Sequence, residues 1–241
     1  MGRMETMRTM VPCRKPHFCI SAVLFDLDGT LIDSINVYYK VVETVFEKLN
    51  LPPVSRGHIY AAVDDGRFRW DRVLPADNVT GKDEIILRSM KLARKIYPDI
   101  FRREVDFFQG VPKLLAGINA LGIKVGIVTA TPSDNMAEKN LLLKRKGVSP
   151  YIETIVTNDD APNPKPAPDS VLECCRRLAV EPQTTLFVGD TGVDIRAGKA
   201  AGTMTVAVLT GFDDRETLDR ETPDAILNQV TDLDGMFVKM G

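Results

Sequence analysis

The chain has 241 residues, 44% of them hydrophobic, and is therefore long enough to bury a sizeable core in one large or two modest domains. Its 31 Lys and Arg against 33 Asp and Glu give a formal net charge of -2, without the basic excess expected of a general nucleic-acid-binding protein. We therefore expect it to bind no nucleic acid and, since it has no long apolar run, no membrane.

The first 19 residues carry basic side chains but no apolar stretch of the length that a signal peptide needs. We interpret residues 1–19 as an N-terminal extension and its His17 as structural. The four cysteines form no C-x-x-C pair, which favours reduced thiols in a cytoplasmic protein over disulfides or a metal site. These cysteines are Cys13, Cys19, Cys174 and Cys175.

From residue 20 onward, short β-branched runs alternate with segments of helical periodicity. This alternation predicts an α/β fold with a doubly wound, Rossmann-like parallel sheet covered by helices on both faces. The predicted strands are 20–26, 124–131, 151–157, 184–190 and 205–211, with an edge strand in 224–230. The predicted helices are 111–121, 133–146, 169–178 and 193–201, with a closing helix over 233–240.

One region interrupts the alternation. Over residues 37–107 the apolar residues have helical spacing and no strand is evident, which predicts an inserted α-helical cap domain. The core domain would then comprise residues 20–36 and 108–241. We expect hinges near 34–37 and 107–110, with closure of the cap over substrate. The pattern fits a monomer or a homodimer equally well.

Two acidic residues follow the first predicted strand, in the segment VLFDLDGTLIDS. Asp26 ends the strand and Asp28 lies two residues further on, although a buried carboxylate is costly unless a partner neutralises it. Asp and Gly are also common in ordinary turns, so the segment alone leaves a plain loop open. In an open α/β sheet, however, ligands bind beyond the carboxyl ends of the strands, where these residues lie.

Polar residues recur at three further strand ends. They are Thr129 in GIVTAT, Lys165 after the third strand, and Asp190 with Asp194 after the fourth. Each has an ordinary explanation, as a strand threonine, a solvated loop lysine, or carboxylates that cap a helix. Their joint occurrence at successive strand ends favours a common site.

These segments resemble the four motifs of the haloacid dehalogenase superfamily of phosphohydrolases. DLDGTLIDS is similar to the first motif, Thr129 to the second, Lys165 in KPAPD to the third and GDTGVDIRAG to the fourth, in matching order and spacing. The resemblance covers nearly all of the chain beyond the extension. The helical insert is similar to the cap of the subgroup that includes phosphoglycolate phosphatases and β-phosphoglucomutases.

The resemblance implies a phosphatase that hydrolyses a small, phosphoglycolate-like phosphorylated metabolite through an aspartyl-phosphate intermediate. Asp26 would be the nucleophile. Asp28 would protonate the leaving alkoxide and then deprotonate the attacking water. Thr129 and Lys165 would complete the catalytic set by contacting the phosphoryl group.

Hard oxygen donors without a nearby Cys or His favour Mg²⁺ as the cofactor. The resemblance assigns this ion to Asp26, the backbone carbonyl of Asp28, Asp190 and Asp194, the last of which would orient ligands.

Substrate choice is expected to reside in the cap. Arg67 and Arg69 lie beside a glycine at about the place of the subgroup's specificity loop, and such a side chain can grip a carboxylate or second phosphate. Two surface arginines are an equally good interpretation. The expected substrate-binding residues are Thr129, Ala130, Lys165, Arg67 and Arg69. We interpret His58 and Trp70 in the same region as structural.

Two alternatives to hydrolysis stay open. A phosphomutase of the β-phosphoglucomutase type would usually carry Glu-Asp where this chain has Gly189-Asp190. A non-catalytic phosphoester-binding protein would have no need of Asp28. Simple hydrolysis is therefore the favoured interpretation.

Overall fold

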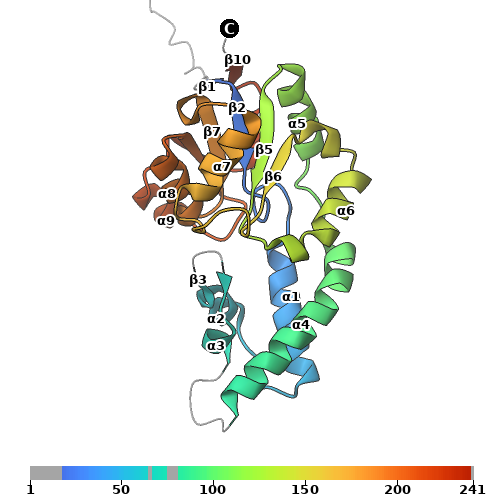
Figure 1. Ribbon diagram of the computed structural model, residues 1–241. Helices are drawn as coiled ribbons and strands as arrows, with labels where there is room; N and C mark the ends of the chain where they lie inside the picture. The colour runs from blue at the N-terminus through green and yellow to red at the C-terminus, as the bar shows by residue number, and fades with distance from the viewer. Residues whose placement is uncertain (1–17, 65–66, 75–80, 240–241) are drawn as a thin grey trace, which may run out of the picture.

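A parallel sheet forms the centre of the molecule (Figure 1). The computed structural model describes residues 18–64, 67–74 and 81–239, and within these the main sheet has six strands in the order β6-β5-β2-β7-β8-β9. Its strands are β2 (Ala22–Phe25), β5 (Lys124–Val128), β6 (Thr154–Val156), β7 (Thr185–Gly189), β8 (Met204–Val208) and β9 (Ala225–Leu227). The predicted α/β class and all six predicted strands of this sheet are confirmed, with shorter bounds, and β6 and β9 form its two edges.

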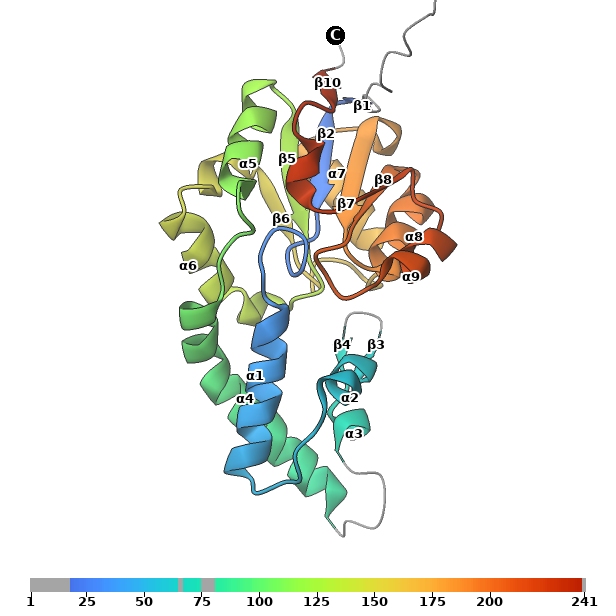
Figure 2. The ribbon, with the colours of Figure 1, turned by 180° about the vertical axis from the view of Figure 1, so that it is seen from behind.

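Helices cover both faces of this sheet (Figures 1 and 2). The helices of the core are α5 (Val111–Ala120), α6 (Ala137–Arg145), α7 (Asp169–Leu178), α8 (Gly192–Ala201) and α9 (Arg215–Arg220). Ala22 and Leu24 of β2 pack in one apolar cluster with residues of α7 and α8. Val23 and Phe25 point to the opposite face, where they join α5. Because successive strand residues alternate in direction, a strand that is apolar throughout can be buried on both faces.

The chain leaves the core after β2 and returns at α5, and the segment between forms the cap in the lower half of Figure 1. Its elements are α1 (Ile35–Lys48), α2 (Arg56–Ala61), β3 (Val63–Asp64), β4 (Arg67–Phe68), α3 (Trp70–Val73) and α4 (Lys82–Glu104). α1 and α4 pack along each other. The helical insertion is confirmed, and the antiparallel β3-β4 pair is a departure from the all-helical prediction.

The two segments that join the cap to the core run side by side. The backbone N–H of Asp33 donates to the carbonyl of Asp106 at 3.0 Å, and that of Phe108 donates to Leu31 at 3.1 Å. The segment that enters the cap and the segment that leaves it are therefore hydrogen-bonded to each other. The domain boundaries and hinges stay predictions.

The predicted closing helix over 233–240 is wrong. The chain instead forms a short 3-10 turn, η4 (Val230–Leu233), and then the strand β10 (Phe237–Lys239). Gly235 has a φ of 77°, which interrupts a helix. β10 pairs in parallel with β1 (Phe18–Ile20), at the end of the segment that the sequence assigned to an extension. The pairing partner lies more than 200 residues away in sequence, and no local pattern reveals it.

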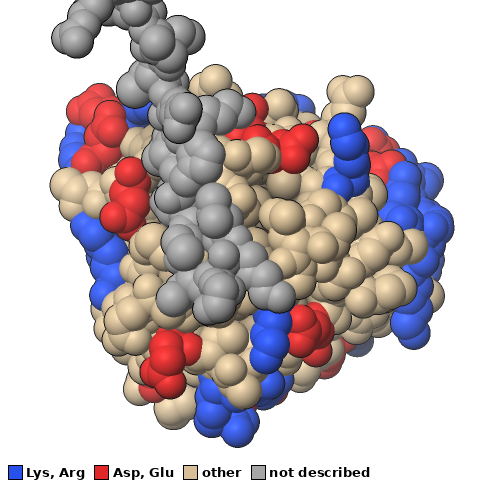
Figure 3. Space-filling model, turned by 90° about the horizontal axis from the view of Figure 1, so that it is seen from above, with Lys and Arg blue, Asp and Glu red and all other residues tan. Residues whose placement is uncertain are grey.

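The face opposite the cap carries both signs of charge. Figure 3 shows acidic and basic side chains around this face, with several basic ones gathered along one edge. Within the described ranges, no helix combines the length and the apolar character needed to cross a bilayer. Cys174 and Cys175 of α7 are buried free thiols, whereas the side chains of Cys13 and Cys19 lie outside the described residues.

Candidate active site

The strand order places the first acidic motif at the centre of the sheet edge. β2 lies between β5 and β7, so the chain continues to β5 and β6 on one side of β2 and to β7, β8 and β9 on the other. Phe25 at the end of β2 pairs with Ile127 on one side and with Val188 on the other. Asp26 follows directly, and its N–H donates to the carbonyl of Val188 at 2.8 Å. Such a point where the chain order reverses, beyond the carboxyl ends of the strands, is where α/β sheets bind ligands.

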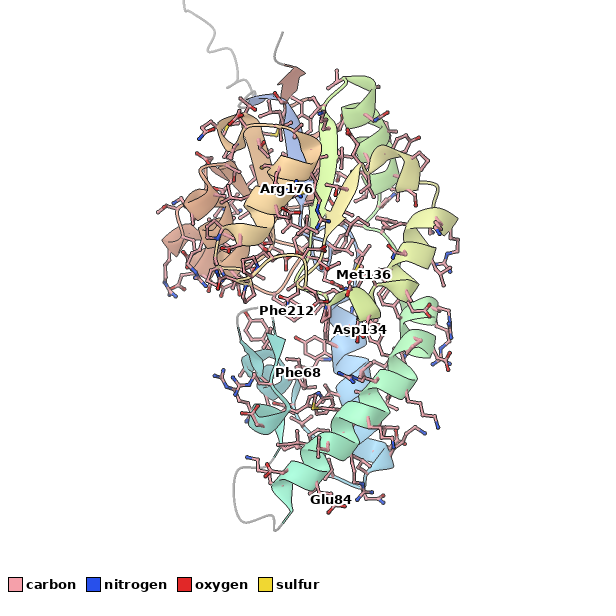
Figure 4. The ribbon with its side chains drawn as sticks, viewed as in Figure 1. Phe68, Glu84, Asp134, Met136, Arg176 and Phe212 are labelled. Atoms are coloured by element: carbon pink, nitrogen blue, oxygen red, sulfur yellow. The ribbon has the colours of Figure 1, made fainter. Side chains whose placement is uncertain are left out.

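A cavity of about 750 Å³ lies at this edge, between core and cap. Figure 4 shows Phe212 on its core side, Phe68 on its cap side and Asp134 near the junction of the two. The cap adds Tyr38 and Trp70, whose ring packs edge-on against Phe68 at 5.0 Å. All the predicted core residues line this cavity: Asp26, Asp28, Thr129, Ala130, Lys165, Asp190 and Asp194.

Lys165 ties two of the carboxylates together. Its Nζ lies 2.7 Å from Asp26 Oδ1 and 2.6 Å from Asp194 Oδ1, and it also donates to the carbonyl of Val128 at 3.3 Å. Burial lowers the pKa of Lys165, but the charges of Asp194 and Asp26 outweigh this effect and raise it above its usual value. The ammonium group therefore stays charged within the core.

Asp26 has one oxygen engaged and one open. Oδ1 accepts from Lys165, whereas Oδ2 accepts no hydrogen bond within the described part of the chain. Burial raises the pKa of Asp26 to about 7; the charge of Lys165 opposes this rise, and those of Asp194 and Asp28 add to it. A carboxylate oxygen that faces a cavity without a partner is free to attack an electrophile or bind a cation.

Asp190 is held from the neighbouring loops. Its Oδ1 accepts from Thr30 Oγ1 at 2.8 Å and its Oδ2 from the N–H of Phe212 at 3.0 Å. Burial, followed by the charges of Asp26 and Asp194, raises its pKa well above the ordinary value. The repulsion between these groups shows how closely the carboxylates converge.

Asp194 orients the site from the first turn of α8. Its Oδ1 accepts from Lys165, and its Oδ2 accepts from the N–H of Thr191 at 3.1 Å and from the Thr191 hydroxyl at 2.5 Å. This reciprocal capping box satisfies the start of the helix and fixes the side chain. Because both oxygens have donors, Asp194 suits a role in holding Lys165 better than one as a direct metal ligand.

Asp28 has a separate set of partners. Its Oδ1 accepts from Ser34 Oγ at 2.7 Å, and its Oδ2 accepts from Thr131 Oγ1 at 3.2 Å and from Lys139 Nζ. Burial raises the pKa of Asp28, but the charge of Lys139 and the hydrogen bonds from Lys139, Ser34 and Thr131 together bring it below its usual value. No pattern in the sequence distinguishes Lys139 from Lys144, the other lysine of α6.

Thr129 is buried and is hydrogen-bonded to Thr131, one of the partners of Asp28. Its hydroxyl donates to Thr131 Oγ1 at 3.1 Å and accepts from the Thr131 N–H at 3.2 Å. Ala130 follows it in the cavity wall.

Arg69, one of the two predicted cap arginines, does not line the cavity. Arg69 donates through Nε and Nη2 to the carboxylate of Asp71, both at 3.0 Å, and is not part of the cavity wall. The side chain of Arg67 lies outside the described residues. Arg94 of α4, which sequence reasoning missed, lines the cavity instead. His58 is exposed beside Ser55, which caps α2, in keeping with the structural role expected of it.

The charge of the site fits a divalent cation. Among the described residues, Lys139 and Lys165 pair with the carboxylates of Asp26, Asp28 and Asp194 and not with that of Asp190, so these six groups carry a formal charge of -2 when all four carboxylates are ionised. No group of three or more His, Cys, Asp or Glu side chains in the described ranges is arranged to hold a metal by itself. A cation here would need Asp26, Asp190, a backbone carbonyl such as that of Asp28, and water, a donor set typical of Mg²⁺.

The sheet topology, the insert and the cavity between them define a capped, doubly wound α/β fold. The family model for haloacid dehalogenase-like hydrolases matches residues 23–208, and the chain belongs to that family. A phosphoglycolate phosphatase from Escherichia coli (strain K12) is 30% identical over 234 residues, covering 89% of this chain and 91% of that protein.

Solved structures show the same architecture. A predicted phosphoglycolate phosphatase from Haemophilus somnus 129PT superposes with a TM-score of 0.79 at 21% identity, over 89% of this chain and 96% of that one. CbbY from Rhodobacter sphaeroides, solved in complex with phosphate, gives a TM-score of 0.70 at 21% identity, over 89% and 96%. A Thermotoga maritima protein assigned as a β-phosphoglucomutase gives 0.69 at 23% identity, over 89% and 97%. At these identities the likeness concerns the fold.

The Gly211→Ala variant tests how closely the chain packs around Asp190. A Cβ at this position would lie 1.7 Å from Asp190 Oδ2, so the Gly211→Ala variant must displace the carboxylate or the loop. We expect it to lower the free energy of unfolding by about 1–3 kcal/mol, the usual cost of overpacking. Gly117→Ala is the matched control, because nothing lies within 4 Å of the added methyl group in α5.

In urea unfolding, Gly117→Ala should match the parent protein or exceed it by up to about 1 kcal/mol, the difference in helix propensity. Equal stability of the Gly211→Ala protein and the parent would contradict the close approach.

Proposed function

We propose that the protein is a Mg²⁺-dependent phosphatase that hydrolyses a small phosphorylated metabolite through an aspartyl phosphate on Asp26. The observation that carries the proposal is the open Oδ2 of Asp26, in a cavity that also contains the carboxylate of Asp28. A nucleophile and a separate proton donor are what a two-step phosphoryl transfer requires.

In the first step, Asp26 Oδ2 attacks phosphorus while the bond from phosphorus to the ester oxygen breaks. Asp28, protonated once the negative phosphoryl group lies beside it, passes its proton to the departing alkoxide. In the second step, Asp28 takes a proton from water, the water oxygen bonds to phosphorus, and the bond to Asp26 breaks. Atoms and charge balance, and Asp28 regains the proton it lost.

Lys165 and Thr129 would stabilise the charge on the phosphoryl oxygens in both steps. Mg²⁺, when bound, supplies the positive charge that allows the phosphate dianion to approach the carboxylates. Asp26 and Asp190 are the side chains that would hold it, while Asp194 keeps Lys165 in place.

The substrate class follows from the cap wall and the relatives. The Escherichia coli relative is a phosphoglycolate phosphatase, which makes a phosphoester with a second anionic group the first compound to test. Arg94 is the cation on the cap side of the cavity wall, within the described residues, and it would bind that second group. The ring systems of Tyr38, Phe68 and Trp70 would contact any apolar portion.

Hydrolysis is favoured over a mutase reaction by the surroundings of Gly189. A Cβ on this residue would lie 2.3 Å from the Cβ of Asp194, so the glutamate usual in β-phosphoglucomutases would displace the partner of Lys165. A non-catalytic binding protein would leave Asp28 without a purpose.

Phosphate release is the first test. We expect the protein to release phosphate from phosphoglycolate or a related ester in the presence of Mg²⁺. In Asp26→Asn the release should fall to background. In Asp28→Asn, kcat should fall about 100- to 10,000-fold, the range of general acid–base catalysis. Asp134→Asn is the control, since this exposed carboxylate also lines the cavity but has no assigned role. Metal binding without release from any ester would point to a binding protein, and isomerisation of a sugar phosphate to a mutase.

Cation binding should stabilise the fold in a pH-dependent manner. The pKa of Asp26 rises from 3.8 to about 7 and that of Asp190 rises as well, so the folded metal-free protein binds more protons than the unfolded chain between these values. The contribution of these two carboxylates to the stability of the metal-free protein therefore falls as the pH rises through this window. We expect Mg²⁺ to raise the Tm more at pH 8 than at pH 5.

The control for this melting experiment is Asp190→Asn, which removes one of the repelling carboxylates. It should melt higher than the parent without metal at pH 8 and show little further rise with Mg²⁺. An unchanged Mg²⁺ response in this variant would contradict the assignment of Asp190.

Arg94→Met tests recognition of the second anionic group. Losing a hydrogen bond to a charged group should raise the KM for phosphoglycolate about 10- to 100-fold, with a smaller effect on kcat. The KM for p-nitrophenyl phosphate, which has no second anion, should change little. Arg88→Met, on an exposed position of α4 outside the cavity wall, is the control. Equal KM changes for both substrates would contradict the role of Arg94.

A further inference from the structure

Lys139 is a buried ammonium group that the proposed reaction does not yet use. It lies in the first turn of α6 with 1% of its surface exposed, and it lines the cavity. Its Nζ donates to Asp28 Oδ2 and to Thr131 Oγ1. Lysine is rarely buried unless it is paired, because the charged group loses its hydration.

Ser34 holds the other oxygen of the same carboxylate. It occupies the N-cap position of α1, where a serine side chain ordinarily accepts from the helix N–H groups, yet it makes no such bond. Its hydroxyl instead donates to Asp28 Oδ1 at 2.7 Å. Asp28 is therefore held from two sides, by Ser34 on one oxygen and by Lys139 with Thr131 on the other.

Stability alone gives little reason for the Lys139–Asp28 pair. Replacing a buried ion pair by apolar residues of similar size is often neutral or stabilising, because both charges lose their hydration. What a pair with two further hydrogen bonds does provide is a fixed orientation of the carboxylate. Proton transfer depends on this orientation, since a displacement of about 1 Å in a catalytic group can cost about 100-fold in rate.

We propose that Lys139 is a positioning residue that, opposite Ser34, holds the Asp28 carboxylate in the orientation needed for proton transfer to the leaving group. The inference rests on the proposed phosphatase function. In that reaction the proton leaves Asp28 for the ester oxygen as its bond to phosphorus breaks and the bond to Asp26 forms. An alkoxide needs this proton to depart, whereas p-nitrophenolate is stabilised by its ring and departs without it.

The dependence of kcat/KM on the leaving group separates positioning from a structural role. In Lys139→Met, we expect kcat/KM for phosphoglycolate to fall about 10- to 100-fold, part of the general-acid contribution, and kcat/KM for p-nitrophenyl phosphate to fall less than about threefold, because kcat/KM reports the first step, in which the leaving group departs, and not the later hydrolysis that both substrates share. Lys139→Arg should recover part of the loss. Lys144→Met is the matched control, an exposed lysine on the same helix, and should behave as the parent protein does.

Ser34→Ala provides a second variant that does not depend on the folding of Lys139→Met. It removes the other anchor of Asp28 without removing a helix cap. We expect the same selective loss for phosphoglycolate, with a Tm within a few degrees of the parent.

Equal losses for the two substrates in both variants, or no loss in either, would overturn the positioning role. If the parent protein released no phosphate from either ester in the presence of Mg²⁺, the proposed function would fail and this inference with it. If the parent protein is active but the variants lose activity equally for both substrates or not at all, the positioning role is overturned and the proposed function stands.

Discussion

The double ion pair of Lys165 is the interaction on which the rest of the site depends. Asp26 directly follows β2 and Asp194 lies in the first turn of α8; both are buried, and each would be strongly disfavoured there without a cation. One ammonium group serves both, so removing it would leave two uncompensated charges in the core. The loop that supplies Lys165 is itself tied down by Asp160, which accepts from Thr157 and pairs with Arg177 of α7.

A second constraint links the acidic centre to the cap. The N–H of Phe212 donates to Asp190, while its ring packs against Tyr38 of α1 at 5.7 Å and Tyr60 of α2 at 6.3 Å. The next residue, Asp213, accepts from the Tyr60 hydroxyl at 3.3 Å. A single short loop therefore contacts both a carboxylate of the site and the two cap helices, which ties the surroundings of Asp190 to the cap.

The sequence predicted the features that local patterns encode, and it did not predict the contacts between segments that are distant in the chain. Apolar runs revealed the strands, and polar residues at their ends revealed Asp26, Thr129 and Asp190 as neighbours, because parallel strands all end at one edge. Lys139 escaped notice because its burial depends on where α6 lies against the first loop. The β1-β10 pair escaped for the same reason, since each partner alone is a short segment without periodicity.

In the cap, too, the sequence did not predict which arginine lines the cavity. Arg69 was singled out for its position beside a glycine, but Asp71, two residues on, provides a carboxylate that engages it in two hydrogen bonds. Arg94 lies in the middle of a long charged helix, where its spacing resembles that of any solvated residue. Only the packing of α4 over the sheet edge places it in the cavity wall.

The two carboxylates proposed as nucleophile and acid have pKa values shifted in opposite directions. Asp26 shares Lys165 with Asp194 and has a raised pKa, whereas Asp28 has Lys139 and two hydroxyl donors and a lowered one. The first step needs the reverse, an ionised nucleophile and a protonated acid. A cation beside Asp26 and Asp190 lowers their pKa values, and a phosphoryl group beside Asp28 raises its own. In the proposed reaction, metal and substrate would together move the two carboxylates toward their reactive protonation states.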